Sequence, residues 1–170
     1  LQQTASHILW LDHYARPELR QEYNQLDDKT RKVVDAIEAT DLSDAGDLDR
    51  LLTTLDNRGI QYLDNCQSRY FLAGSHAIGH EDLLHLGMRP KLREAMRDFA
   101  VIGIGERMPD FIARLSGEIG VPLTYCDKRV NEGKSLRTIN LSNSDIRTVL
   151  SKRLILDLWL YQAVSVSAWN

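Results

Sequence analysis

Four basic side chains gather in one short stretch of this chain, opposed only by Asp127 and Glu132. A glycine, flexible backbone amides and several cations suit a phosphate or sulfate group, because arginine offers a planar fork and lysine a point charge. On composition alone, the alternative is a solvated basic loop. The cations are Lys128, Arg129, Lys134 and Arg137, accompanied by the hydroxyls of Ser135 and Thr138.

Two other motifs are approached in the sequence, and both fail on spacing. His80 and His85 resemble the histidine pair of the zinc motif HExxH, but they are five residues apart, and that motif needs a separation of four. His76 and His80 have the required separation but no evident third ligand, so surface or loop histidines are the better account. Gly133-Lys134-Ser135 ends like the nucleotide-binding motif GxxxxGK[ST], yet its first glycine would fall on Lys128.

The elements that must position these residues are mostly helical. Ala100 to Ile104 interrupts that pattern, because it is short, uncharged and rich in β-branched residues, as in a strand buried on both faces of a parallel sheet. Helical spacing resumes at Met108, with Pro109 in a first turn and Gly120 as a stop. We therefore predict an α/β fold, mostly helical, with one or few parallel strands.

Capping residues set several expected helix boundaries. Asp27 or Asp28 suits the start of the helix that carries Val33, Val34 and Ile37. Asp47 suits the start of the next amphipathic helix, and Ser142 suits the start of the last one.

Length and composition bound the class of protein. The 170 residues form a single predicted domain, 1–170, long enough for a substantial core. With 21 basic and 24 acidic residues, the chain is not expected to be a general nucleic-acid binder. Two cysteines do not make a disulfide scaffold, and no apolar run reaches the length of a membrane span.

Several segments, taken in chain order, resemble one family. Asp64 to Gly74 is similar to the Asn-x-Gln-Thr-Arg-x-Leu-Ala-Gly segment of bacterial sulfotransferases related to heparan sulfate 2-O-sulfotransferase. Phe99 to Arg107, with the helix after it, resembles that family's strand and leucine-rich helix. The basic loop, Leu141-Ser142 and the stretch Leu156 to Tyr161 then match in order and spacing. The similarity covers nearly the whole chain from about Ser6.

The resemblance implies transfer of a sulfuryl group from 3′-phosphoadenylyl sulfate to a hydroxyl of an acceptor, which we expect to be a carbohydrate. It implies a P-loop-like α/β core and no metal. In the family, the phosphosulfate loop and the catalytic base lie on segments that would precede Leu1, so we expect the C-terminal portion of a sulfotransferase domain, inactive by itself. The family would place such an enzyme in the cytoplasm of a bacterium or the Golgi lumen of a eukaryote.

Part of the cofactor site can be carried over residue by residue. Ser6 matches the family's serine at the 3′-phosphate, and Lys134, Ser135 and Arg137 resemble its C-terminal cofactor loop. The same residues would hold the product, adenosine 3′,5′-bisphosphate. Gln3 departs from the pattern, because the family has an arginine there.

The acceptor residues are expected among arginines. Arg16 and Arg20 match an Arg-Pro-x-Leu-Arg stretch where the heparan sulfate enzyme has substrate arginines, and Arg129 suits an anionic glycan as acceptor. No residue matches the catalytic base. The histidines that have the right chemistry for a base are His7, His13, His76, His80 and His85.

Two alternatives from other classes stay open. One is a non-catalytic helical module that binds an anionic partner through the 128–137 basic loop. The other is a different α/β transferase that shares only the strand and helix around Ala100 to Gly120.

Overall fold

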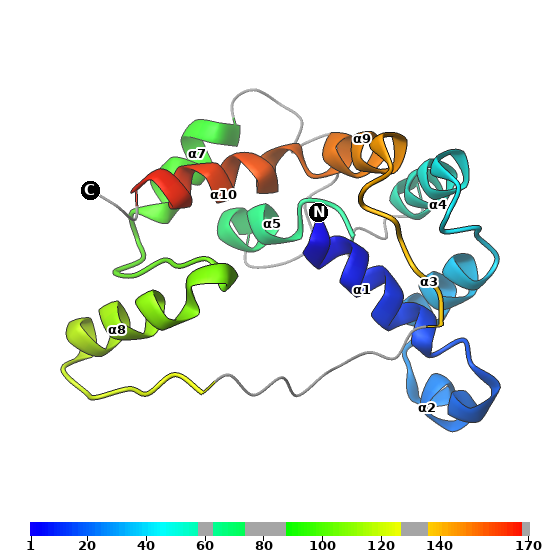
Figure 1. Cartoon of the computed structure of the whole chain (residues 1–170), viewed down its shortest axis with the longest axis horizontal. Coiled ribbons are helices and arrows are strands. Elements are labelled where there is room, and N and C mark those ends of the chain that lie inside the picture. The colour runs from blue at the N-terminus through cyan, green and yellow to red at the C-terminus, as the bar shows by residue number, and fades with distance from the viewer. Residues whose placement is uncertain (58–62, 74–87, 127–135, 168–170) are drawn as a thin grey trace. The chain divides into compact units, whose positions relative to one another are not determined.

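The computed structural model describes residues 1–57, 63–73, 88–126 and 136–167, and these residues form helices joined by turns and extended segments (Figure 1). The elements are α1 (Gln2–His13), η1 (Pro17–Leu19), α2 (Arg20–Gln25), α3 (Asp28–Glu38), α4 (Ala45–Asn57), α5 (Cys66–Ala73), α7 (Met88–Met96), η2 (Gly105–Arg107), α8 (Met108–Ile119), α9 (Ser144–Arg153) and α10 (Ile155–Ser167).

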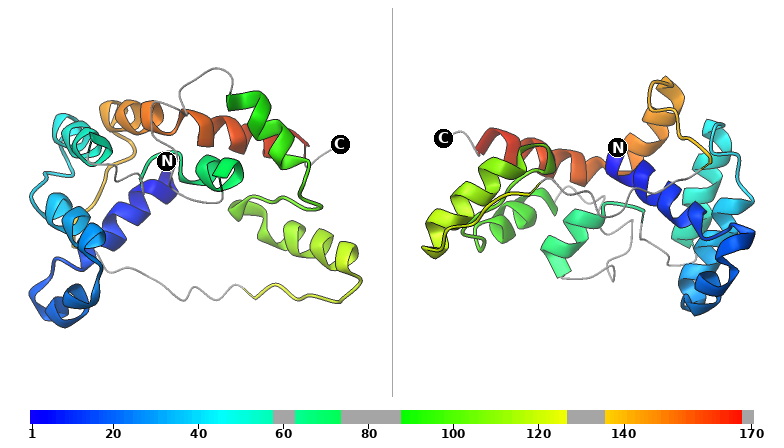
Figure 2. Two further views of the ribbon diagram at one scale, coloured as in Figure 1. Left: turned by 180° about the vertical axis from the view of Figure 1, so that it is seen from behind. Right: turned by 60° about the horizontal axis from the view of Figure 1, so that its bottom comes forward.

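The predicted α/β fold is wrong for the described part of the chain, which contains no strand and no sheet. Ala100 to Ile104, the expected strand, is an unpaired segment between α7 and η2, and neither view in Figure 2 has a strand arrow there. The physical reason is that no other described segment pairs with it, since a strand is stable only when its backbone groups are paired. The described residues are an all-helical fold.

The apolar run from Val101 to Ile104 instead lies against α8. A Cβ atom placed on Gly103 would meet the Cβ and ring of Phe111 at 2.6 Å, so the backbone of the segment touches that ring. Val101, Ile102 and Ile104 are half-buried. The β-branched side chains that predicted a strand are therefore only partly covered in this segment.

Local capping explains where several helices begin and end. The carboxylate of Asp27 accepts from the backbone N–H groups of Lys29 and Thr30 at 2.9 Å, which confirms the predicted start of α3. The Thr30 hydroxyl also donates to Asp27, and this bond lowers the pKa of that carboxyl. Gly120 ends α8 in the left-handed conformation at φ 67°, as predicted.

Two predicted caps are wrong, one by three residues and the other by one. Asp44, rather than Asp47, accepts at the start of α4, from the N–H of Asp47 at 2.8 Å. Asn143, rather than Ser142, caps α9 by accepting from Asp145 at 2.8 Å. Ser, Asp and Asn are all good caps, so a run of them fixes a boundary only approximately.

The chain divides into two compact units, each made of two chain segments. Unit 1 comprises Leu1–Cys66 and Asn131–Leu154, and unit 2 comprises Gln67–Val130 and Ile155–Asn170.

Unit 1 holds most of the buried apolar side chains. Here α1 packs against α3, α3 packs against α4, and α4 packs against α9 (Figure 1). Each helix contributes one apolar stripe at three- and four-residue steps. The fully buried members are Ile8, Val33, Val34, Ile37, Leu48, Leu55, Ile146 and Leu150.

Unit 2 has a smaller buried core. Leu92 of α7 and Leu156 of α10 are its buried centre, and half-buried Phe71, Leu72, Met88 and Trp159 pack around them. Phe71 also contacts Phe99, with ring centroids 4.9 Å apart. By contrast, α8 buries none of its side chains completely, although its apolar residues share one face.

Candidate functional site

A run of buried polar residues marks the segment that resembles the sulfotransferase motif. Asp64, Asn65, Ser68 and Arg69 have at most 6% of their surface exposed. Burying polar groups is costly unless each is hydrogen-bonded, so such a run indicates a specific structural or functional demand. The boundary between the two units falls inside this run, with Asp64 and Asn65 in unit 1 and Ser68 and Arg69 in unit 2.

In unit 2, the N-terminus of α5 is capped by a residue from α10. The carboxylate of Asp157 accepts from the Ser68 backbone N–H at 2.8 Å and from the Ser68 hydroxyl at 2.6 Å. It also accepts from the Gln67 backbone N–H at 3.2 Å. A carboxylate suits this position because the first amides of a helix lack internal partners and carry partial positive charge.

In unit 1, Asn65 joins its own turn to the end of α9. Its Nδ2 donates to the carbonyl of Arg153 and to Oδ1 of Asp64, each at 2.7 Å. Asn65 has φ 40°, in the left-handed region that asparagine tolerates better than most residues. The hydrogen bond to the Arg153 carbonyl therefore stabilises a positive φ that most other residue types adopt less readily.

Arg69, on α5 in unit 2, has no exposed surface. A guanidinium stays charged, and removing a charge from water costs several kcal/mol before its partners compensate. The buried environment therefore restricts the residue type at position 69 more than solvent does at an exposed arginine.

The predicted cofactor residues have different positions. Ser6 is exposed on α1, where a ligand can reach it. Lys134 and Ser135 lie outside the described residues. Arg137 is described, and it belongs to unit 1 together with Ser6.

The guanidinium of Arg137 has partners inside unit 1. Its Nη1 donates to Asp12 Oδ1 at 2.8 Å and to the carbonyl of Ile37 at 3.1 Å, and its Nη2 donates to the carbonyl of Thr40. A cation near the last carbonyls of α3 is favourable, because a helix C-terminus carries partial negative charge. These contacts give Arg137 a structural role in addition to the phosphate contact predicted for it.

The predicted acceptor arginines lie around the turn that follows α1. Arg16 precedes η1, and its Nη2 is buried without a hydrogen-bond partner among the described residues. Arg20 is exposed at the start of α2, with its guanidinium carbon 4.8 Å from the centroid of the Tyr23 ring. Arg129 lies outside the described residues.

The catalytic base stays unassigned. His7 is half-buried on α1, and burial lowers its pKa from the usual 6.5. Its ring lies 5.8 Å from that of Trp10. His13 ends the same helix, with Nδ1 buried and without a hydrogen-bond partner among the described residues. His76, His80 and His85 lie outside those residues.

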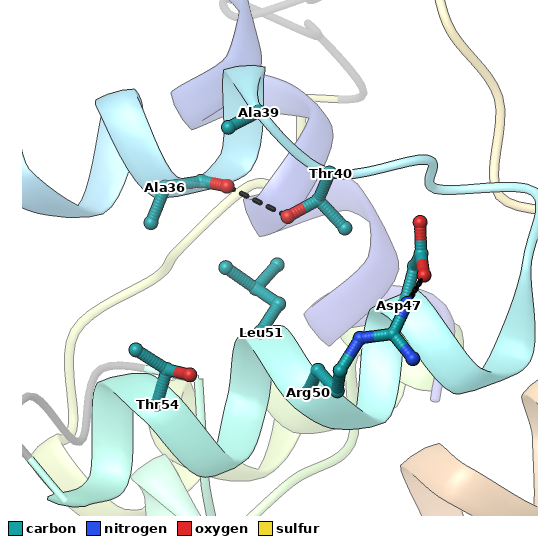
Figure 3. A pocket seen from close by; sticks show the side chains of 7 residues that line it. All are labelled: Ala36, Ala39, Thr40, Asp47, Arg50, Leu51 and Thr54. Atoms are coloured by element: carbon teal, nitrogen blue, oxygen red, sulfur yellow. Dashed lines mark hydrogen bonds and ion pairs between the residues drawn. The ribbon is translucent and has the colours of Figure 1, made fainter.

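A shallow pocket of about 240 Å³ lies between the end of α3 and α4 in unit 1 (Figure 3). Three of its polar side chains already have partners: Arg50 pairs with Asp47, and the Thr40 hydroxyl donates to the carbonyl of Ala36 at 2.7 Å. None of the predicted site residues lines this pocket. It is lined by Ala36, Ala39, Thr40, Asp47, Arg50, Leu51 and Thr54.

The described residues contain no group of three or more histidine, cysteine, aspartate or glutamate side chains placed to hold a metal ion. None of their helices combines the length and apolar character needed to cross a membrane.

The sequence analysis did not single out the residues that form and cap the buried run of polar side chains. Asn65, Arg69 and Asp157 belong to the stretches that carry the resemblance, but they were not expected as site residues. A polar residue on the apolar face of a predicted helix can indicate a buried polar contact, and Asp157 between Leu156 and Leu158 is one example. Asp12, the partner of Arg137, gives a weaker signal because it could equally face solvent.

Comparison of the chain with protein-family models, curated proteins and solved structures gives no match.

Proposed function

We propose that this chain takes part in sulfuryl transfer from 3′-phosphoadenylyl sulfate to an acceptor hydroxyl, as the helical portion of a sulfotransferase. One observation carries the proposal. The two stretches that resemble the family, around Ser68 and around Asp157, are 89 residues apart in sequence and are joined by a part-buried hydroxyl–carboxylate bond. If the two stretches resembled the family only by chance, there would be no reason to expect their side chains to contact each other.

The proposal does not depend on the P-loop-like sheet, which the described residues lack. It assigns to this chain only part of the nucleotide site, namely Ser6, Lys134, Ser135 and Arg137. Cations at that site would stabilise the charge that develops on the sulfuryl group and the leaving phosphate. Because no residue matches the family's catalytic base, we expect the 170-residue chain to bind nucleotide without turnover.

The test is binding of adenosine 3′,5′-bisphosphate, measured by isothermal titration calorimetry. Adenosine 5′-monophosphate, which lacks the 3′-phosphate, is the control ligand and should bind at least about tenfold more weakly, because charged hydrogen bonds are each worth about 1.5 to 3 kcal/mol. Equal affinity for the two nucleotides, or no binding of either, would refute the proposal.

Ser6→Ala is the most informative variant, because Ser6 is exposed and its loss should leave α1 intact. It should weaken binding of the bisphosphate but not of the monophosphate. Ser142→Ala, at another exposed serine of unit 1, is the matched control and should leave both affinities unchanged. Arg137→Ala is less informative, because it also removes the contacts to Asp12 and to the end of α3.

The second candidate is a non-catalytic helical module that binds an anionic partner through the 128–137 basic loop. The all-helical described chain favours it, since such modules need no sheet. One experiment distinguishes the two candidates. If the chain is part of a sulfotransferase, the wild-type chain binds the bisphosphate and Lys134→Glu should abolish that binding. If it is a non-catalytic module, the wild-type chain binds neither nucleotide.

A further inference from the structure

Unit 2 contains a long stretch, residues 97–126, in which no side chain is buried. It comprises the turn after α7, the segment before η2, then α8 and the segment that follows α8. Five of its large apolar side chains are exposed by 38% to 52%, namely Phe99, Ile119, Val121, Leu123 and Tyr125. Monomeric soluble proteins rarely leave contiguous apolar surface uncovered, so such a patch marks an interaction site.

The apolar face of α8 lies between two extended segments. Phe111 lies against Gly103 of the segment before η2. The Ser116 hydroxyl donates to the carbonyl of Val121 at 2.7 Å and accepts from the N–H of Leu123 at 3.1 Å, which holds the segment after α8. At about 100° per residue, Phe111 and Ser116 are about 140° apart around the helix, and the stripe between them is apolar. The stripe consists of Met108, Ile112, Leu115 and Ile119.

The segment after α8 is fixed beside the helix. Gly120 reverses the chain at φ 67°, and residues 121–126 run back along α8 (Figure 1). The bonds to Ser116 hold the backbone there, while the side chains of Val121 and Leu123 stay exposed. A surface that is ordered before it binds loses less entropy on association. We call the C-terminal end of the stripe together with this segment the α8 surface (Leu115, Ile119, Val121, Leu123 and Tyr125).

Two charges on one flank of α8 make this surface complementary to itself. Arg114 and Glu118 are exposed, and each directly precedes a residue of the stripe. Neither forms an ion pair within the described chain, whereas Arg107 and Asp110 pair at 3.6 Å near the start of the same helix. An arginine four residues before a glutamate is also the less favourable order for a pair within one helix.

A second copy of the helix can supply the missing partners. When two identical helices pack antiparallel, the same flank of both comes together and their directions oppose. Arg114 of one copy can then lie opposite Glu118 of the other, and the contact occurs twice. A twofold interface uses the same surface of both copies, so it requires this kind of self-complementarity.

The charges of the stretch favour a second copy over other occupants. They are balanced in sign, so the stretch has no field that would select an acidic or a basic partner. The basic members are Arg97, Arg107 and Arg114, and the acidic members are Asp98, Glu106, Asp110 and Glu118. A helix that lies on an anionic membrane is rich in lysine and arginine, whereas α8 has one arginine and two acids.

We propose that two copies of this chain associate about a twofold axis through the α8 surface, with their α8 helices antiparallel. The apolar side chains of the surface supply the main favourable term, and Arg114 of each copy pairs with Glu118 of the other. The inference goes beyond the proposed function and does not depend on it, because the predicted nucleotide-binding residues all belong to unit 1.

Sedimentation equilibrium of the 170-residue chain measures the association. The wild-type chain should be a monomer in dilute solution and approach the mass of two copies as its concentration rises. Ile119→Asp should weaken the dimer at least about tenfold, because it places a charge in each half of the interface. Val166→Asp is the matched control, since Val166 is an even more exposed apolar residue of unit 2 and lies on α10. Equal losses in the two variants would overturn the proposal.

Charge exchange tests the antiparallel arrangement. Arg114→Glu alone and Glu118→Arg alone should each weaken the dimer about tenfold, because either change turns two attractions into two repulsions. The chain with both substitutions should regain most of the affinity. An equimolar mixture of the two single variants should form a mixed dimer, because one copy then presents two acids to two cations of the other. Absence of either restoration would overturn the proposed pairing.

Amide hydrogen exchange locates the contact. Peptides covering α8 should exchange rapidly in dilute solution and more slowly as the chain concentration rises, whereas peptides covering α3 should change less. Exchange in α8 that does not depend on concentration, while the mass rises to two copies, would place the interface elsewhere and overturn the proposal.

The same measurements distinguish the other occupants. A chain that stays monomeric up to about 1 mM would refute the proposal and leave a different protein as the partner. A mass that rises past two copies would refute the twofold arrangement, because it indicates an open-ended contact. Binding to phosphatidylglycerol vesicles that is lost in Ile119→Asp, without self-association, would instead assign the surface to a membrane.

Discussion

At the scale of single residues, the carboxylate of Asp157 is the clearest case of a side chain whose environment defines its role. It accepts three hydrogen bonds at the start of α5, two of them from Ser68. We expect Asp157→Ala to lower the free energy of unfolding by about 1 to 3 kcal/mol, because it removes the cap and leaves buried donors unpaired. Urea denaturation measures this loss.

A double-mutant cycle with Ser68→Ala isolates the pair. Removing the hydroxyl from a chain that already lacks Asp157 should cost less than removing it from the wild-type chain, with a coupling energy of about 0.5 kcal/mol or more. Strictly additive losses would mean that the two side chains do not act together, and the observation that carries the proposed function would lose its force.

His7 gives a prediction about pH. Burial lowers its pKa in the folded state below the unfolded value of 6.5. As the pH falls through that value, the unfolded chain takes up more protons than the folded chain, so the His7 contribution lowers stability. The loss stops growing once the pH is below the folded-state pKa. His7→Gln should therefore reduce the fall in stability between about pH 7.5 and about pH 5.

The control for this experiment is His13→Gln, which removes an imidazole from the same helix and leaves His7 in place. Titration of the imidazole protons by NMR gives an independent reading. A folded-state value for His7 at or above 6.5 would contradict the prediction.

At the scale of elements, the segment before α8 depends on a close approach between backbone and ring. Gly103→Ala would place a methyl group 2.6 Å from atoms of Phe111, well inside normal contact distance. The segment or the helix must shift, and we expect a loss of about 1 to 3 kcal/mol in the free energy of unfolding. Thermal and urea denaturation both report it.

Gly117→Ala is the matched control, since it lies within α8 and a methyl group there meets nothing within 4 Å. Alanine is the better helix former, so this variant should gain about 0.5 to 1 kcal/mol. Opposite signs for the two substitutions would support the contact of Gly103 with Phe111. A gain at both positions would show that the segment does not rest on α8.

The same elements show which features of the fold can be predicted from the sequence. Helical periodicity identified the apolar faces of α3, α4 and α8, because a buried stripe depends only on the local repeat. It failed at Ala100 to Ile104, because a β-branched run becomes a strand only if a second strand pairs with it, which no local pattern can show. The partners of Arg137 and Asp157 were equally out of reach, since each lies in a distant segment of the chain.

At the scale of the whole molecule, the two units differ in the size of their cores. In the described part of unit 2, the buried apolar side chains are only Leu92, Leu156, Leu160 and Val164, whereas unit 1 buries a stripe from each of four helices. Burial of apolar surface is the main favourable term in folding, so the free energy of local opening should differ in the same direction.

Amide hydrogen exchange followed by mass spectrometry tests this difference in the intact chain. Peptides covering α3 and α4 should exchange most slowly, because their inward side chains, such as Ile37 and Leu48, have no exposed surface. Peptides covering α8 should exchange fastest among the longer helices, since none of its side chains is fully buried. Ile37→Ala, which leaves a cavity and costs about 2 to 5 kcal/mol, should speed exchange in α1 and α3. Protection of α8 equal to that of α4 would contradict the assignment of unequal cores, because it would require a covering surface on α8.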